Sequence, residues 1–299
     1  ASGGSYKVSV ILKTLAAEYW QYVKSGAEDY ASEHSDKVTV EVKGPSSETA
    51  FDEMQNMIET DLSSGSYDGV IISPLQSDTA AQLVSGTKLP IVAIDTNFTA
   101  PEVKSFVGTG NEAAAKKGGE AAVEAAKAAG WTDIKCIEIA GVQGDQTNTA
   151  RMNGYKAGVE EAGGTFLSDE VQYADATADR ATTAMEAIMQ THPEGIAIIC
   201  ANNDDMAMAA ARAAQGHDAY KNTIFLGFNG DRAACEAILA GQMTMSVAQM
   251  AYEMGYKAVE TMVQVLDGET VDEFVDSGSD VVTPDNAQER LDTLKTQLH

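Results

Sequence analysis

Polar and charged side chains stand directly after short apolar runs at many points along the chain. Asp95 and Thr96 follow the run Pro90–Ile94, and Asn203 closely follows the run Gly195–Ala201. The same arrangement recurs at Lys13, Ser73, Asn229 and Gln249. Carboxylates accept hydrogen bonds, ammonium groups donate them, and amides and hydroxyls do both. This mixture suits a neutral ligand rich in hydroxyl groups, because each hydroxyl is both a donor and an acceptor.

Two further groups fit the same chemistry. Arg151 comes after the apolar run Ile134–Ala140, and its guanidinium donates through a planar fork. Tyr19 and Trp20 stand shortly after the first apolar run. The C–H faces of a sugar ring pack on aromatic rings, so this pair could form a platform for one. Together these residues predict a site for a small sugar or polyol.

The same residue types also have ordinary structural roles. Asp, Asn and Ser after a strand are common helix N-caps and turn formers. We expect Asp204, Asp231 and Asn111 to be caps. Ser73 precedes a proline, so a turn and a ligand contact fit it equally well. The aromatic pair also fits core packing, and it is the repetition of polar strand ends in both halves that favours the ligand interpretation.

The sequence offers little to other chemistry. The histidines are scattered and form no metal-ligand pair at helical spacing, at His34, His192, His217 and His299. The cysteines have no neighbouring histidine, and we expect structural thiols at Cys136, Cys200 and Cys235. No phosphate-binding loop, dinucleotide fingerprint or nucleophile elbow follows a predicted strand. We therefore expect no enzyme, no cofactor and no metal site.

Apolar runs alternate with helical patterns twice along the chain. In the first half the predicted strands are Lys7–Leu12, Val38–Lys43, Gly69–Ser73, Pro90–Ile94 and one near Ser105–Thr109. In the second half they are Ile134–Ala140, Thr165–Tyr173, Gly195–Ala201, Thr223–Phe228 and Met243–Ala248, and the tail has a short strand near Asp280–Val282 and a helix over Pro284–Leu298. Short strands that are apolar throughout are typical of parallel sheets buried on both faces. The pattern predicts an α/β protein with two doubly wound lobes, and ligands bind such sheets beyond the carboxyl ends of their strands.

Composition narrows the classes of partner. The chain has 299 residues, enough for two lobes with separate cores, and no apolar run long enough to span a bilayer. Lys and Arg total 20 against 45 Asp and Glu, a formal net charge of −25. Such a surface repels phosphate backbones, so we expect no nucleic-acid partner. Residues Ala1–Ser5 are small and polar and are interpreted as a flexible leader.

Several strings resemble one family. Val10–Leu15 with Tyr19 and Trp20 resembles the first strand and loop of the ribose- and allose-binding proteins, in the type I periplasmic binding protein family of ABC transporters. Other strings fit the same pattern, namely Ile72–Leu75, Ile94-Asp95, Asn203–Met208, Gly227–Gly230, Ala240–Thr244 and Val247–Gln249. The resemblance runs from about Tyr6 to Thr283.

The resemblance implies two lobes joined by a hinge of three crossing segments, which close over a sugar. The N-terminal lobe is expected at 6–107 plus 250–278, and the C-terminal lobe at 108–249 plus 279–299. The expected ligand contacts are Lys13, Tyr19, Trp20, Ser73, Asp95, Thr96, Arg151, Asn203, Asn229 and Gln249. Asn229 stands where the family usually has an aspartate, and Thr96 where it commonly has a charged residue.

The implied function is the solute-binding component of an ABC transporter, with a pentose, hexose or cyclic polyol as ligand. We expect a monomer that presents its ligand to a membrane permease outside the cytoplasm. It would be free in a periplasm, or a lipoprotein anchored to the outer face of the membrane of a Gram-positive bacterium, with its signal peptide removed. The alternative is the effector-binding core of a sugar-responsive transcription regulator, although a first strand near Lys7 leaves no room for a DNA-reading helix pair.

Overall fold

A computed structural model of the chain describes residues 5–299, so of the leader expected at Ala1–Ser5 all but Ser5 lies outside the described residues. The described residues group into two compact units, each treated by itself below. Unit 1 comprises the described part of Ala1–Thr109, with Met250–Gly278 and Thr296–His299, and unit 2 comprises Gly110–Gln249 and Ser279–Lys295. The last four residues thus group with unit 1, whereas the sequence analysis placed them in the second lobe.

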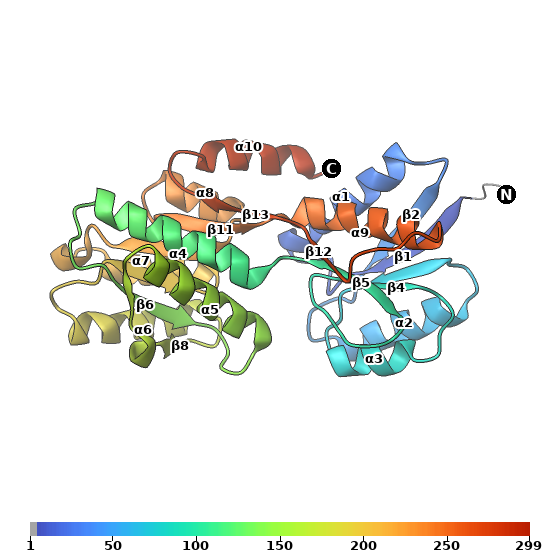
Figure 1. Cartoon of the computed structure of the whole chain (residues 1–299), viewed down its shortest axis with the longest axis horizontal. Coiled ribbons are helices and arrows are strands. Elements are labelled where there is room, and N and C mark those ends of the chain that lie inside the picture. Colours follow the sequence, from blue (N-terminus) through green and yellow to red (C-terminus); the bar gives the residue numbers. More distant parts are fainter. Residues whose placement is uncertain (1–4) are drawn as a thin grey trace. The chain divides into compact units, whose positions relative to one another are not determined.

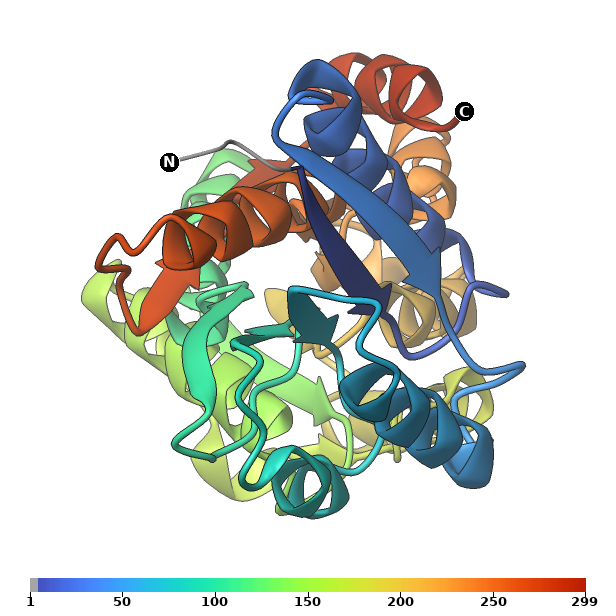
Figure 2. The same cartoon turned by 90° about the vertical axis from the view of Figure 1, so that its right-hand side faces the viewer.

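Unit 1 is a parallel sheet with helices on both faces. Its strands are β1 (Tyr6–Ile11), β2 (Val38–Lys43), β3 (Gly69–Ile72), β4 (Ile91–Ile94), β5 (Val103–Gly108) and β12 (Phe274–Asp276), and its helices are α1 (Glu18–Glu33), α2 (Phe51–Ser63), α3 (Ser77–Val84) and α9 (Ala251–Leu266). The strand order is β12-β5-β4-β3-β1-β2. Helices α1 and α9 lie on one side of this sheet and α2 and α3 on the other (Figure 2).

Unit 2 repeats this plan. Its strands are β6 (Lys135–Ala140), β7 (Thr165–Phe166), β8 (Gln172–Tyr173), β9 (Ile198–Ala201), β10 (Ile224–Asn229), β11 (Met245–Gln249) and β13 (Ser279–Val282). Its helices are α4 (Asn111–Ala128), α5 (Gln146–Glu161), α6 (Ala178–Thr191), α7 (Asp204–Ala214), α8 (Arg232–Leu239) and most of α10 (Ala287–Gln297), with short 3₁₀ turns at Ser168–Glu170 and Asp218–Tyr220. The order is β13-β11-β10-β9-β6-β7, with β8 also pairing β6, and Figure 1 labels the elements.

The order of the first strands creates a switch point in each sheet. In unit 1 the chain goes from β1 to β2 on one side and then to β3 on the other, and in unit 2 it goes from β6 to β7 and then to β9. At a switch point, the loops that follow two adjacent strands run to opposite sides of the sheet. The carboxyl ends of these two strands are therefore open to a ligand. The fold confirms the predicted class of two parallel-sheet α/β lobes.

The strands are buried because their sequences are apolar on both faces. Every residue of β3 and β4 is buried, as is every residue of β9. In unit 1, side chains of β1, β3 and β4 pack against Met54, Ile58 and Val84 of α2 and α3. In unit 2, alanines of α4 let that helix approach the sheet closely around Tyr155 and Phe228. These cores hold the strand ends in fixed positions.

Three details differ from the sequence analysis. The strand predicted at Thr165–Tyr173 is wrong, because a 3₁₀ turn separates β7 from β8, and Glu170 in it contacts His192 at 2.6 Å. Strand β12 was not predicted, since its residues are only half-buried or exposed and lie in an acidic segment. Strand β13 joins the otherwise parallel sheet of unit 2 in the antiparallel direction.

Candidate functional site

The switch point of unit 1 places two predicted residues at neighbouring strand ends. Ser73 follows β3 and is fully buried, and its main-chain N–H donates to Ile11 O at 2.8 Å. Its hydroxyl oxygen has no hydrogen-bond partner among the described residues. Lys13, which follows β1, is half-buried, and its ammonium makes no hydrogen bond or ion pair within residues 5–299. Both groups therefore have unused hydrogen-bonding capacity where a ligand would bind.

Asp95 sits on a strained turn at the end of β4. Its φ is 65°, and the Thr96 N–H donates to Ile94 O at 2.7 Å, which makes Asp95 the centre of a γ-turn of the rarer, positive-φ form. The Thr96 hydroxyl donates to Asp95 Oδ1 at 2.9 Å, and the Tyr19 hydroxyl donates to Asp95 Oδ2 at 2.7 Å. Such strain persists where the surroundings enforce it, and it gathers at functional sites. The structure thus brings Tyr19, Asp95 and Thr96 together.

The two predicted aromatic residues have different surroundings. Tyr19 is half-buried, and its ring meets that of Trp20 edge to face with centroids 5.0 Å apart. Trp20 is only 3 % exposed, and its indole N–H donates to Glu48 Oε1 at 3.0 Å. The ring of Tyr19 is therefore partly accessible beside Asp95, whereas Trp20 is a core residue that packs against Tyr19.

Arg151 of α5 is held by contacts within unit 2. Its Nε donates to Asn111 Oδ1 at 3.0 Å, and its Nη1 donates to the main-chain oxygen of Asn202 at 2.7 Å. Its guanidinium carbon lies 3.8 Å from the centroid of the Phe228 ring, a cation–π contact. These contacts hold the planar group against the carboxyl ends of β9 and β10, so that it is preorganised for a ligand.

Two adjacent asparagines follow β9 at the switch point of unit 2. Asn202 is 4 % exposed, and its amide nitrogen donates to Asn148 Oδ1, which also accepts from the Gly141 N–H at 2.7 Å. The side-chain oxygen of Asn202 is buried and has no partner among the described residues. Asn203 caps α7 by accepting from the Met206 N–H at 2.8 Å, and its amide nitrogen donates to Ala176 O at 3.2 Å.

Asn229 and Gln249 form an amide pair at the ends of β10 and β11. The Gln249 Nε2 donates to Asn229 Oδ1 at 2.7 Å. Gln249 is 8 % exposed, and Asn229 has a φ of 135°, in a region that side chains rarely adopt. Within residues 5–299, non-glycine residues with positive φ all lie just beyond or at the carboxyl end of a strand, at Asp95, Asp175, Ala176 and Asn229.

Two of the predicted helix caps are wrong and one is confirmed. Asp231 caps α8 by accepting from the Ala234 N–H at 2.9 Å. Gly110 is the N-cap of α4, so Asn111 is the first residue of that helix. The Asn111 side chain instead accepts a hydrogen bond from Arg151. Asp204 is likewise inside α7, since Asn203 precedes it as the cap.

Asp204 has a different role, in the interior of unit 2. It is 1 % exposed, accepts from the Gly230 N–H at 2.8 Å through Oδ2, and accepts from the Ser246 hydroxyl at 2.6 Å through Oδ1. Burial, followed by the nearby charge of Asp231, raises the pKa of Asp204 to about 7, although the Ser246 and main-chain hydrogen bonds act in the opposite direction. Sequence patterns did not reveal this contact, because Gly230 is far from Asp204 along the chain.

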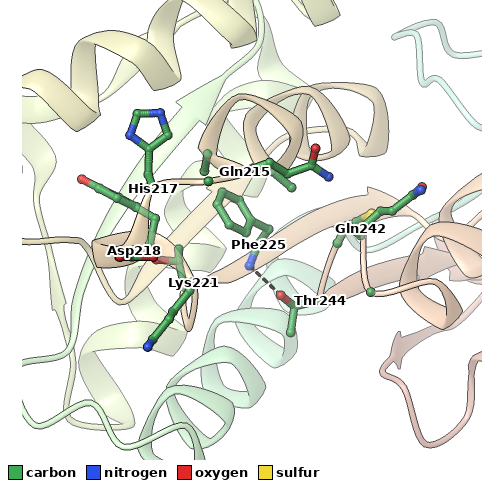
Figure 3. A pocket seen from close by; sticks show the side chains of 14 residues that line it. Gln215, His217, Asp218, Lys221, Phe225, Gln242 and Thr244 are labelled. Atoms are coloured by element: carbon green, nitrogen blue, oxygen red, sulfur yellow. Dashed lines mark hydrogen bonds between the residues drawn. The ribbon is translucent and has the colours of Figure 1, made fainter.

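A hollow in the surface of unit 2 lies away from these strand ends. It has a volume of about 230 Å³ and is lined by the end of α7 and by the segments that lead into β10 and β11 (Figure 3). Phe225 and Thr244, joined by a hydrogen bond of 3.0 Å, lie at the amino ends of these strands. Asn229 and Gln249 lie at the other ends, so this hollow is separate from the candidate site.

Neither a metal centre nor a membrane span stands out in the described part of the chain. No grouping of His, Cys, Asp and Glu side chains among residues 5–299 suits a metal ion. Over the same residues, no helix has both the length and the apolar character needed to cross a bilayer. The thiols of Cys136, Cys200 and Cys235 are unpaired by disulfides and buried, which confirms their predicted burial.

Comparison with known proteins gives a consistent result. The chain is 30 % identical to the D-allose-binding periplasmic protein of Escherichia coli (strain K12) over 265 residues, which cover 85 % of this chain and 83 % of that protein. It is 27 % identical to the ribose import binding protein RbsB of the same organism, over 88 % of this chain and 86 % of that protein. These relatives are named as binding proteins and not as enzymes.

A solved structure agrees with this fold and with these relatives. An ABC transporter solute-binding protein of Mycobacterium smegmatis, crystallised with bound glycerol, superposes with a TM-score of 0.74 at 25 % identity and covers 96 % of each chain. The sequence model of the periplasmic binding protein domain matches residues 8–270, most of the chain. The protein therefore belongs to the periplasmic binding protein domain family.

Proposed function

We propose that the protein is the extracytoplasmic solute-binding component of an ABC transporter and that it binds a monosaccharide, namely a pentose, a hexose or a cyclic polyol. In this proposal the residues at the carboxyl ends of the strands bind the sugar. The relatives named for D-allose and ribose support the ligand class. The chemistry of the strand ends in each unit supports it independently.

The observation that carries the proposal is a pair of unsatisfied polar atoms at equivalent places. Ser73 is the first residue after β3, and Asn202 is the first residue after β9. Each of these strands lies beside the first strand of its sheet, β1 or β6 respectively, and so borders the switch point. The Ser73 hydroxyl and the side-chain amide oxygen of Asn202 (Oδ1) are both buried without a partner among the described residues. A buried polar group without a partner costs about 1–3 kcal/mol, which a ligand hydroxyl at each place would recover.

The surrounding groups match a neutral polyhydroxylated ligand. The Asp95 carboxylate accepts, the Arg151 guanidinium and the Lys13 ammonium donate, and the amide pair Asn229–Gln249 does both. A sugar ring also needs an apolar surface for its C–H faces, which the half-buried ring of Tyr19 offers beside Asp95. In this reading no group acts as a nucleophile or general base, so the bound sugar leaves unchanged.

The finer parts of the proposal concern the setting. We propose that the protein acts as a monomer and that its partner is the membrane permease of an ABC transporter. The family and the periplasmic relative support a location outside the cytoplasm. We propose that the mature protein is either free in a periplasm or anchored by a lipid to the outer face of the membrane, and mass spectrometry of the protein isolated from its own cells distinguishes the two.

Isothermal titration calorimetry with a panel of sugars tests the proposal. The panel contains D-allose, D-ribose, D-arabinose, D-fucose, myo-inositol and glycerol, each titrated into the intact protein at neutral pH. We expect a saturable signal with one site per chain for at least one sugar. Silence across the whole panel, with the protein shown to be folded by circular dichroism, would remove the sugar assignment.

A further inference from the structure

Arg290 lies outside the set of predicted ligand contacts, yet it touches the backbone that carries two of them. It belongs to α10, beyond residues 8–270 that match the family. Its Nε donates to Gly230 O at 2.7 Å, and its Nη2 donates to Gln249 O at 3.1 Å. One half-buried guanidinium therefore bridges the main chain just after β10 to the last residue of β11.

The main chain of Gly230 is held by a second group as well. Its N–H donates to the buried carboxylate of Asp204 at 2.8 Å, while its C=O accepts from Arg290. Gly230 has a φ of 68°, and a Cβ at this residue would lie 2.8 Å from Ala248 Cα and 3.1 Å from Arg290 Nε. Only glycine fits this close approach, so the position of the turn is set by groups on both sides of it.

This turn determines where the amide pair lies. Asn229 immediately precedes Gly230 and pairs with Ala248 in the register of β10 and β11, and Ala248 immediately precedes Gln249. The side chains of Asn229 and Gln249 are bonded to each other at 2.7 Å. Because Arg290 binds the main chain next to Asn229 and the main chain of Gln249 itself, it fixes the separation of the two strand ends and hence the direction of both amides.

We propose that Arg290 is a positioning residue for the amide pair Asn229–Gln249 and thereby sets the affinity for the sugar. The inference rests on the proposed function, and it extends the site to a helix beyond residues 8–270, which the family model matches. A guanidinium suits this task because its planar fork reaches two carbonyl oxygens at once, which the single ammonium of a lysine does less well.

A set of variants tests the inference by calorimetry with the sugar that binds the wild type. Arg290→Ala is expected to weaken affinity about tenfold, which corresponds to about 1.4 kcal/mol, and Arg290→Lys to weaken it less. Lys295→Ala is the matched control, because it removes a positive charge from an exposed position of the same helix. We expect Lys295→Ala to bind as the wild type does.

A double-mutant cycle separates positioning from general stability. If Arg290 acts through the amide pair, its loss should cost little affinity once Asn229→Ala has removed that pair, so the two effects should be clearly non-additive. Additive losses, or unchanged affinity in Arg290→Ala, would overturn the inference. If Arg290→Ala does not fold, the Arg290→Lys variant carries the same cycle.

A readout without ligand keeps this inference distinct from the proposed function. In ¹H–¹⁵N correlation spectra, the side-chain amide signals of Asn229 and Gln249 should shift or broaden in Arg290→Lys and stay in place in Lys295→Ala. Unmoved signals in Arg290→Lys would refute the positioning role even where sugar binds the wild type. Moved signals with no sugar bound by any variant would instead refute the proposed function and, with it, the role of Arg290 in affinity.

Discussion

At the level of single residues, the unusual features of each unit gather at the carboxyl ends of its strands. Asp95 and Asn229 both have positive φ, and each is bonded through its side chain to a second predicted contact, Tyr19 and Gln249 respectively. Backbone strain of this kind costs about 1–3 kcal/mol per residue and must be offset by neighbouring structure. This strain occurs in each unit at the carboxyl ends of the strands, as expected of a binding site built on strand ends.

The charge of Asp95 gives the first prediction. Replacing it by asparagine keeps the size of the side chain and the tolerance of positive φ, but it replaces a charged acceptor with a neutral amide. Hydrogen bonds to charged groups contribute about 1.5–3 kcal/mol, so we expect Asp95→Asn to weaken sugar binding by about tenfold to a hundredfold in calorimetry.

Asp52→Asn serves as the control for Asp95→Asn, because Asp52 is exposed on α2 and lies outside the site. Both variants should unfold at nearly the same temperature as the wild type. Equal affinity in Asp95→Asn and Asp52→Asn would show that the carboxylate of Asp95 does not touch the sugar.

Glu138 is a buried acid with a different consequence. It lies in β6, is fully buried, and neither carboxyl oxygen has a partner within residues 5–299. Burial raises the pKa of Glu138 to about 8 from the usual 4.5. Because the folded-state pKa is raised, the native state binds the proton more tightly than the unfolded chain does, and the resulting stability is present below about pH 4.5 and is lost as the pH rises through about 8.

The Glu138→Gln variant tests this pH dependence. The amide cannot ionise, so the variant should not lose stability as the pH rises from about 5 to about 9, whereas the wild type should. The free energy of unfolding of the variant minus that of the wild type should therefore increase across this range by up to a few kcal/mol. Urea unfolding at both pH values measures the gain. A difference between the two proteins that stays constant with pH would show that Glu138 does not titrate in this range.

At the level of elements, helix contacts set the positions of the site residues. Helices α1 and α9 cross at glycines: a Cβ on Gly26 would lie 1.9 Å from Tyr252 O, and one on Gly255 would lie 1.9 Å from Val23 O. The absence of side chains there lets the two backbones touch. Because Tyr19 is in the first turn of α1, the depth of this crossing also sets how Tyr19 reaches Asp95.

Gly255→Ala should therefore destabilise the protein. An added methyl group would push the helices apart, and overpacking of this kind costs about 1–3 kcal/mol or more. Thermal unfolding should show a lower midpoint, and sugar affinity should fall as Tyr19 shifts. Ser32→Ala, at an exposed position of α1, should change neither quantity. A wild-type midpoint in Gly255→Ala would mean that the helices can separate at little cost.

Most elements of the chain could be predicted from sequence, because their signals are local. Runs such as Val70–Ile72 and Ile91–Ile94 are apolar on both faces and have no alternative to a buried strand. The segment Thr165–Tyr173 misled the prediction because apolar residues flank a polar stretch that turns away to contact His192. The caps at Asn111 and Asp204 were misassigned because neighbouring residues compete for the cap position, and long-range partners decide between them.

The site was predictable only in part, for a related reason. Residue types at strand ends indicated Asp95, Arg151, Asn229 and Gln249, since strand ends can be located from local patterns. Asn202 and Arg290 required the structure. Asn202 looks like its neighbour Asn203 in sequence, and Arg290 lies in a polar helix far along the chain from the strands it binds. Contacts between residues that are far apart along the chain leave no local pattern in the sequence.

At the level of the whole molecule, charge is the dominant property. With a formal net charge of −25, the acidic groups of the folded chain repel one another. Added salt screens this repulsion, and the screening becomes stronger as the salt concentration rises. We expect the unfolding midpoint to rise between about 20 mM and about 500 mM NaCl, since the Debye length falls across this range. A neutral sugar releases no counterions, so its affinity should stay nearly constant.

The test compares how the unfolding midpoint and the sugar affinity each change with salt concentration. Calorimetry and thermal unfolding in the same buffers measure both. Affinity that falls steeply with added salt would indicate an ionic ligand and would contradict a neutral sugar as the natural one. An unfolding midpoint that falls with salt would show that ion pairs outweigh the net repulsion.

The crystal structure of the protein with the sugar that gives the strongest calorimetric signal tests the central claim most directly. We expect one sugar molecule whose hydroxyls lie within about 2.5–3.2 Å of the Asp95 carboxylate and of the Asn229–Gln249 amide pair. A sugar bound elsewhere, for example in the hollow of Figure 3, with Asp95 and Asn229 free of any contact to it, would contradict the account.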